Sequence, residues 1–184
     1  MVQNGSGSTG QEATARAALG QRRWGTALQI TTLCIVYVGA ARIGLLMAYT
    51  HKNVSPVWPP SGVAMAALLL FGARMWPGVA LGALLANFTT GLPLPTALGI
   101  AIGNTLEALA AVQIVRLLGD FNPSLARLRD VFRLALAVPV SAVPAATGGV
   151  LCLALSGVIG WAAFGPAWRT WWLGDAIGMV VWGP

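Results

Sequence analysis

Residues 95–118 read PTALGIAIGNTLEALAAVQIVRLL, and only Glu107 and Arg116 among them are charged. As a helix this stretch would be about 36 Å long, which is enough to cross the ~30 Å hydrocarbon core of a bilayer. The whole chain of 184 residues has the same character, because 57% of its residues are hydrophobic and 9% are charged. Soluble domains average about 25% charged residues. The composition, with a mean hydropathy of +0.74, therefore excludes an ordinary soluble enzyme and indicates several membrane spans.

The apolar stretches predict an all-α fold, a polytopic transmembrane helical bundle with about six membrane-crossing segments. Residues 1–23 are polar and are expected to form a disordered tail, whereas residues 24–184 form the membrane domain. The predicted helices cover residues 25–49, 59–72, 77–90, 95–118 and 130–155, and a sixth runs from about residue 167 to the end. The second and third would be only about 18–24 Å long, so they should form a short hairpin that either crosses a thinned bilayer or re-enters on one side. Pro139 and Pro144 predict a bend in the fifth helix.

The distribution of basic residues predicts the orientation in the membrane, because cytoplasmic loops of membrane proteins are enriched in Lys and Arg. If the N-terminal tail is cytoplasmic, Lys52 and Arg169 fall outside and Arg42 falls within the first helix. The remaining basic residues all fall inside: Arg16, Arg22, Arg23, Arg74, Arg116, Arg127, Arg129 and Arg133. The tryptophans agree, since each lies at the end of a predicted helix or in the outer loop, where aromatic belts form. Both termini are therefore predicted to be cytoplasmic.

Several kinds of site are excluded by composition. A net charge of +6 would suggest nucleic acid in a soluble protein, but no polar segment interleaves basic residues with aromatics, so the expected partner is the lipid bilayer and not nucleic acid. His51 is the only histidine, and Cys34 and Cys152 both lie in apolar runs, so no metal site and no cofactor are expected. Ser61 lacks the Gly-x-Ser-x-Gly frame of a hydrolase nucleophile, and no catalytic residue is assigned.

Charged residues inside predicted spans are the first candidates for a site, since each costs roughly 2.5–3.5 kcal/mol on insertion scales. Arg42 lies about two turns from the outer end of the first helix, and Asp175 about two turns from the outer start of the sixth. Their similar depths predict an ion pair. The pair either fixes the packing of the helices or takes part in a polar ligand site.

Glu107 lies near the middle of the fourth helix, in line with Gly99 and Gly103. Helices approach closely along such a stripe of small residues, so Glu107 should face protein and not lipid. A carboxyl group shielded from water should be neutral or hydrogen-bonded, with Asn87 or Asn104 as its partner. Its role is either structural or that of a carboxylate that senses protons or a cationic ligand.

Tryptophans at the outer side could add to such a site, or could only anchor the helices in the aromatic belt. On the sixth helix, Trp168 and Trp172 share a face with Asp175 by helical spacing. The full set of candidate ligand-binding or signal-sensing residues is Glu107, Asn104, Asp175, Arg42, Asn87, Trp58, Trp168 and Trp172.

Five blocks of sequence resemble one bacterial family. They are VWPPSG at 57–62, LFGARMWPG at 70–78, GNTLEA at 103–108, RDV at 129–131 and WRTWWLGDAIG at 168–178. In order and spacing they are similar to the membrane-associated sensor 1 domain, over about residues 28–184. The resemblance places Arg74, Asn104, Glu107 and Asp175 within the shared blocks.

The resemblance implies a non-catalytic input domain in the bacterial inner membrane, which precedes a histidine kinase, diguanylate cyclase or cyclic-di-GMP phosphodiesterase module. Such domains usually continue through further helices into a cytoplasmic output domain, so the chain is expected to be incomplete at its C-terminus. The expected partners are that output domain or a separate signalling protein, with a homodimer in the full-length context.

The leading interpretation is therefore a sensory module of a signal-transduction protein. A small transporter or solute-binding membrane subunit, with Glu107 and Asp175 in a midplane site, is the alternative. An intramembrane enzyme is the least favoured class, because no nucleophile is paired with a base.

Overall fold

The computed structural model describes residues 6–48, 54–122 and 124–183, with side chains from Trp24 onward. The described chain is all-α, as predicted, and has no β-sheet. Its helices are α1 (Ser6–Leu46), α2 (Pro59–Phe71), α3 (Trp76–Phe88), α4 (Leu94–Leu117), α5 (Leu128–Leu155) and α6 (Phe164–Trp182), with short 3-10 turns η1 (Ala73–Met75) and η2 (Trp161–Ala163). The loop that holds His51 and Lys52 lies outside the described residues.

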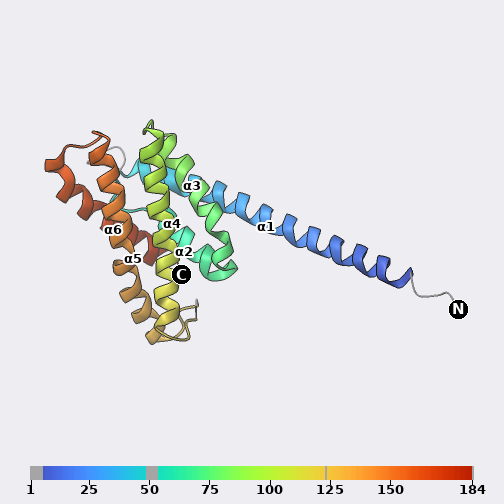
Figure 1. Ribbon diagram of the computed structural model, residues 1–184. Coiled ribbons are helices and arrows are strands. Elements are labelled where there is room, and N and C mark those ends of the chain that lie inside the picture. The colour runs from blue at the N-terminus through green and yellow to red at the C-terminus, as the bar shows by residue number, and fades with distance from the viewer. Residues whose placement is uncertain (1–5, 49–53, 123, 184) are drawn as a thin grey trace.

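The helices form one bundle in which α2 occupies a central place. Helix α4 packs between α3 and α5, α6 packs on α5, and α1 packs on α3. Helix α2 contacts α1, α4 and α6. Figure 1 shows α4 and α5 side by side, and α1 extending far beyond the other helices toward its N-terminus. The first turn of α2 is therefore reached by helices from distant parts of the sequence.

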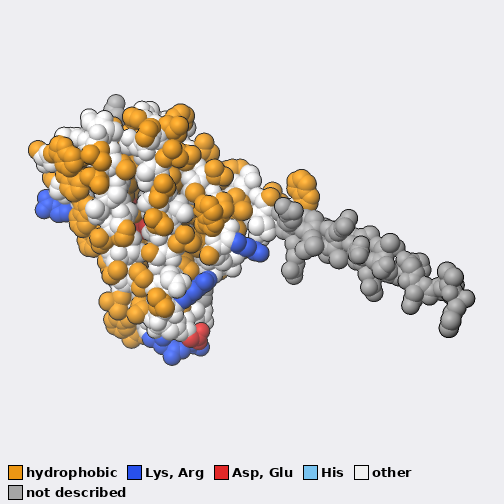
Figure 2. Space-filling model, in the orientation of Figure 1, with side chains coloured by type: hydrophobic (Ala, Val, Ile, Leu, Met, Phe, Trp, Pro, Cys, Tyr) orange, Lys and Arg blue, Asp and Glu red, His pale blue; other side chains and the backbone are white. Residues whose placement is uncertain are grey.

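The outer surface of the bundle is suited to lipid. Three helical segments are long and apolar enough to span a membrane: Trp24–Leu46, Leu94–Leu117 and Leu128–Leu155. Large apolar side chains are exposed along these helices, including Leu28, Ile102 and Leu136. Figure 2 shows hydrophobic side chains over most of the visible face, with Lys and Arg gathered mainly near one end of the bundle. This surface is the one that a bilayer would cover.

Helices α2, α3 and α4 begin where prolines in the sequence predict a helix start, but α1 begins earlier than predicted. Prolines occupy the first turn of α2, α3 and α4, where a missing N–H leaves no hydrogen bond unmade. Helix α1, in contrast, begins at Ser6, so most of the segment expected to be a disordered tail is helical. Helix α5 continues from Leu128 to Leu155 through both Pro139 and Pro144.

A non-helical segment, residues 54–58, leads into α2 and lies against α6. Trp58 N donates to Gly174 O at 2.9 Å, and Val54 and Ser55 are buried. A Cβ atom on Gly174 would collide with Ser55 O, and one on Gly178 would collide with Trp58 O. Glycine is therefore required at both positions of α6 for this close approach. Non-helical backbone at this depth is tolerated because protein covers it.

Candidate functional site

Ser61 joins two carboxyl groups at the start of α2. Its Oγ lies 3.0 Å from Glu107 Oε2 and 3.0 Å from Asp175 Oδ1. All three side chains are buried, with Glu107 1% and Asp175 0% exposed. The cluster therefore links α2, α4 and α6 through one hydroxyl group. The positive end of the α2 dipole is directed at the same place and stabilises negative charge there.

The Ser61 contacts also set a minimum number of protons in the cluster. A serine hydroxyl donates one hydrogen bond and can accept others. Both 3.0 Å contacts are therefore hydrogen bonds only if one carboxyl group carries a proton and donates to Ser61 Oγ, while the hydroxyl donates to an oxygen of the other carboxyl group. The cluster thus holds at least one proton and carries at most one negative charge.

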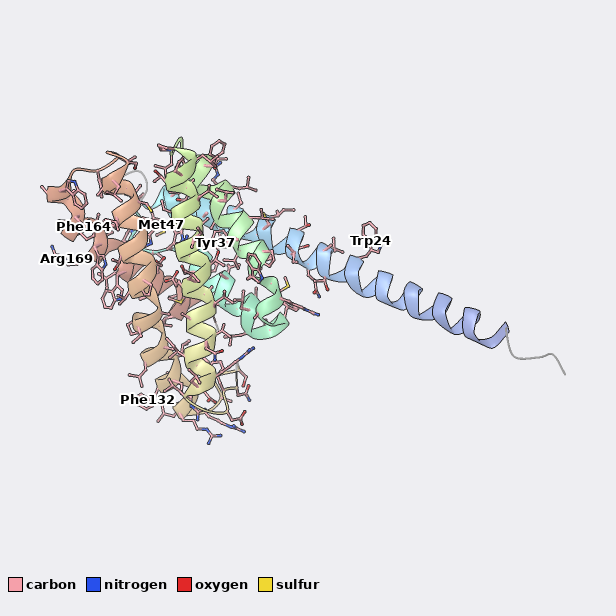
Figure 3. All side chains as sticks on the ribbon, viewed as in Figure 1. Trp24, Tyr37, Met47, Phe132, Phe164 and Arg169 are labelled. Carbon is pink, nitrogen blue, oxygen red and sulfur yellow. The ribbon has the colours of Figure 1, made fainter. Side chains whose placement is uncertain are left out.

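A second polar pair lies beside the cluster. Asn104 Nδ2 donates to the hydroxyl oxygen of Tyr37 at 3.1 Å. Asn104 is one turn before Glu107 on α4, and Tyr37 comes from the C-terminal part of α1. Tyr37 is 0% exposed, and Figure 3 shows it within the bundle, far from Trp24 on the projecting part of α1. This pair extends the buried polar region to α1.

A small cavity opens between these groups. Its volume, measured as the space for the centre of a water-sized group, is about 10 Å³. It is lined by Ser55, Trp58, Asn87, Asn104, Trp171 and Asp175. A cavity of roughly this size holds a single water molecule or an ion of similar size. Among the described residues, no three His, Cys, Asp or Glu side chains come together as a metal-binding group.

Four buried polar atoms of the cavity lining and the adjacent carboxyl cluster make no hydrogen bond within the described structure. Three are acceptors: Asn104 Oδ1, Glu107 Oε1 and Asp175 Oδ2. The fourth is the donor Trp58 Nε1. A buried polar atom without a partner costs about 1–3 kcal/mol, and three of the four belong to residues that line the cavity, so the cavity is suited to a small polar occupant.

Comparison with known proteins identifies the domain. The family model for MASE1 matches residues 28–184. The chain belongs to the MASE1 family. MASE1 is a membrane sensory domain and not a catalytic one, so the buried cluster belongs to a sensory domain. The resemblance drawn from the sequence blocks is thereby confirmed.

One curated relative of this MASE1 domain is the probable diguanylate cyclase DgcE of Escherichia coli strain K12. The two are 31% identical over 134 residues, which is 70% of this chain. The chain matches only 12% of that relative's length. No solved structure matches the chain.

The structure brings five of the eight candidate residues to the MASE1 cavity and its carboxyl cluster: Trp58, Asn87, Asn104, Glu107 and Asp175. Glu107 is hydrogen-bonded, but its partner is Ser61 and not Asn87 or Asn104. Asn87 Nδ2 instead donates to Ala83 O of its own helix at 2.8 Å. The asparagines lie at the cavity wall, while the serine at the start of α2 reaches between the carboxyl groups.

The predicted ion pair between Arg42 and Asp175 is wrong. Both residues lie in the described part of the chain, where Arg42 is exposed on α1 and Asp175 is fully buried against Ser61. The sequence predicts similar depths in the membrane for the two residues. Depth does not determine which face of each helix packs against another helix. An exposed Arg near a helix end can extend its guanidinium group to the headgroup layer, so burial with a carboxylate is not needed.

Trp168 and Trp172 do not line the cavity. Their rings stack with centroids 6.0 Å apart, and their indole N–H groups donate to α5: Trp168 to Thr147 Oγ1 at 2.9 Å and Trp172 to Pro139 O at 2.8 Å. These two side chains fasten α6 to α5. Trp171, one position away on the helix, is the tryptophan of α6 that lines the cavity.

Ser61, Tyr37, Ser55 and Trp171 are site residues that sequence reasoning missed. Serine and tyrosine are common in membrane helices, so neither attracts notice as a charged residue does. One signal was available for Ser61: it follows two prolines at a helix start, where side chains of the first turn face the end of the helix.

Proposed function

We propose that this MASE1 domain is the input module of a bacterial signal-transduction protein, located in the inner membrane with its N-terminus in the cytoplasm. The observation that carries the proposal is the family match over residues 28–184. The similarity to a probable diguanylate cyclase favours cyclic-di-GMP synthesis as the output, with the catalytic domain on the C-terminal side. Dimerisation of the full-length protein would bring two such output domains together.

The Ser61 cluster is suited to changing the packing of the bundle. Its hydrogen bonds join α2, α4 and α6, and one added or lost charge alters two of them at once. A ligand or proton that binds one arrangement of helices more tightly shifts the population toward it. Helix α6, which carries Asp175, is the most C-terminal helix described and would pass the shift toward the C-terminal side of the chain.

The size of the cavity argues against transport of an organic solute through this site. Space for one water-sized group does not accommodate an organic solute, and such ligands usually occupy about 300–1,000 Å³. Of three larger grooves, those between α1 and α2 and between α3 and α4 have almost wholly apolar linings, which suits lipid contact better than polar solute binding. The third has a mixed lining and lies at the end of α4, away from the cluster, beside Arg116 and residues 119–121. Uptake of a solute by the reconstituted chain would favour the transporter alternative.

A fusion protein tests the sensory role. The chain is joined to a diguanylate cyclase domain, and cyclic-di-GMP is measured in cells that express the parent fusion or its Glu107→Gln variant at equal membrane levels. Glutamine keeps the shape but removes a titrating group, so we expect cyclic-di-GMP to change by about fivefold or more, as for a typical allosteric coupling.

The matched control is Asp120→Asn, because the Asp120 side chain is 93% exposed and lies in the loop that follows α4, outside the buried cluster. It should leave cyclic-di-GMP at the parent level. Equal cyclic-di-GMP in the parent and Glu107→Gln fusions, over a range of external pH and salt, would count against a signalling role for the cluster.

A further inference from the structure

We propose that the cavity beside Ser61, Glu107 and Asp175 is a binding site for one monovalent metal cation of about the size of Na⁺. This inference deepens the proposed sensory function, because it names the class of ligand that the site takes. Its test measures binding to the purified chain and needs no output domain, so its failure would leave the sensory role standing.

Charge is the first argument for a cation. Among the residues that the structure describes, no basic side chain lines the cavity or joins the Ser61 cluster. The lining contains the neutral residues Ser55, Trp58, Asn87, Asn104 and Trp171 with the acidic Asp175, and the adjacent groups are Tyr37, Ser61 and Glu107. Within the described chain, the two ion pairs join Arg127 to Asp120 and Arg133 to Asp130, all within residues 120–133. Neither pair reaches the cluster.

The proton count limits the charge of that cation. The two Ser61 contacts require at least one proton between the two carboxyl groups, which leaves at most a single negative charge. An uncompensated charge in a membrane interior is costly, so a partner of one positive charge restores neutrality. A divalent cation would overcompensate unless the shared proton left.

The oxygen atoms at the cavity are of the kind that coordinates a hard monovalent cation. Asn104 Oδ1 and Asp175 Oδ2 belong to residues of the cavity lining and make no hydrogen bond within the described structure, and Glu107 Oε1 lies in the adjacent carboxyl cluster. Asn104 is 98% buried, and both Asn104 and Asp175 line the cavity itself. Carboxylate and amide oxygens are the ligands that hard cations prefer. A cavity volume of about 10 Å³ accommodates one such ion or one water molecule.

The experiment is thermal unfolding of the full chain in lipid nanodiscs, with NaCl replacing choline chloride at constant ionic strength. Choline is a monovalent cation too large for the cavity, so it controls for screening. We expect the Tm to rise with Na⁺ and to saturate, by about 5 °C or more when Na⁺ is a hundredfold above its Kd.

Variants of the lining residues test whether Na⁺ binds at this cavity. Asp175→Asn removes the charge and should abolish the Na⁺-dependent rise. Because that variant could fail to fold, Asn104→Ala gives a second test, which should raise the Na⁺ concentration for half-maximal effect at least tenfold. Asp130→Asn is the matched control, since Asp130 is equally buried but pairs with Arg133 outside the cavity. It should keep the full Na⁺ response.

The results of these experiments distinguish Na⁺ binding at the cavity from proton binding alone and from Na⁺ binding elsewhere. A Tm that follows Na⁺ in the parent and in Asp130→Asn, but not in Asp175→Asn, supports the cation site. A Tm that changes with pH but is the same in Na⁺ and choline would mean that the cluster binds protons alone, and would overturn the proposal. A Na⁺ effect that persists in both Asp175→Asn and Asn104→Ala would also overturn it, because the ion would then bind elsewhere.

Discussion

Ser61 is the residue on which the buried cluster depends, because its hydroxyl is the hydrogen-bond partner shared by Glu107 and Asp175. Ser61→Ala would leave two carboxyl oxygens without that partner. We expect the free energy of unfolding to fall by about 2–4 kcal/mol, which corresponds to the usual cost of one to two unsatisfied buried groups. Thermal unfolding in detergent should show a Tm lower by roughly 5–10 °C.

A matched serine controls this prediction. Ser141 is also buried, but its hydroxyl donates to Val138 O of its own helix and contacts Met179 Sδ at 3.9 Å. Ser141→Ala should therefore cost less than about 1 kcal/mol, since no charged group loses a partner. Equal loss of Tm in the two variants would mean that the Ser61 contacts contribute little to stability.

The residues of the site could be predicted in part. Glu107, Asn104 and Asp175 stand out in the sequence because polar groups inside apolar spans need a physical reason. Their common partner could not be found in this way, because serine is inexpensive to bury and carries no charge. The Arg42–Asp175 pair failed for a different reason: the sequence gives depth along each helix, whereas the direction of each side chain depends on packing between helices.

At the scale of elements, contact between the 54–58 segment and α6 depends on glycine. A Cβ atom at position 178 would collide with Trp58 O, which belongs to backbone that cannot rotate away. Gly178→Ala should therefore destabilise the protein by about 1–3 kcal/mol, as overpacking in a filled core does. Thermal unfolding measures the loss.

Gly148 in α5 is the control, because a Cβ atom there would meet nothing within 4 Å. Gly148→Ala should be neutral or stabilising by up to about 1 kcal/mol, since alanine favours the helix. If Gly178→Ala were as stable as Gly148→Ala, the 54–58 segment could move away from α6 without cost, and the packing described above would be loose.

Element limits were predictable where the chain has local signals. Pro59 and Pro60 marked the start of α2 because proline suits only the first turn of a helix. The start of α1 was missed because the apolar pattern begins near Trp24, while the helix extends back through a polar stretch to Ser6. The 54–58 segment was expected to be part of a loop, and its burial arises from glycines more than a hundred residues later.

At the scale of the whole molecule, the arrangement of charge predicts how the bundle sits in the membrane. The loop between α4 and α5 lies at one end of the bundle, while the α3–α4 turn and the α5–α6 loop lie at the other (Figure 1). Figure 2 shows Lys and Arg gathered mainly near the first of these ends. Because basic loops stay in the cytoplasm, this end should face inward.

Reporter fusions test this orientation. Alkaline phosphatase, which is active only outside the cytoplasm, should be inactive when inserted between Gly119 and Arg127 and active when inserted at Gly160. A fluorescent protein that folds only in the cytoplasm should give the opposite pattern at the same two positions. The sequence carries eight basic residues at the inner ends against two at the outer ends, so the expected difference between the sites is large. Phosphatase activity at the α4–α5 loop would reverse the orientation, and would place the cytoplasmic output proposed above on the wrong side of the membrane.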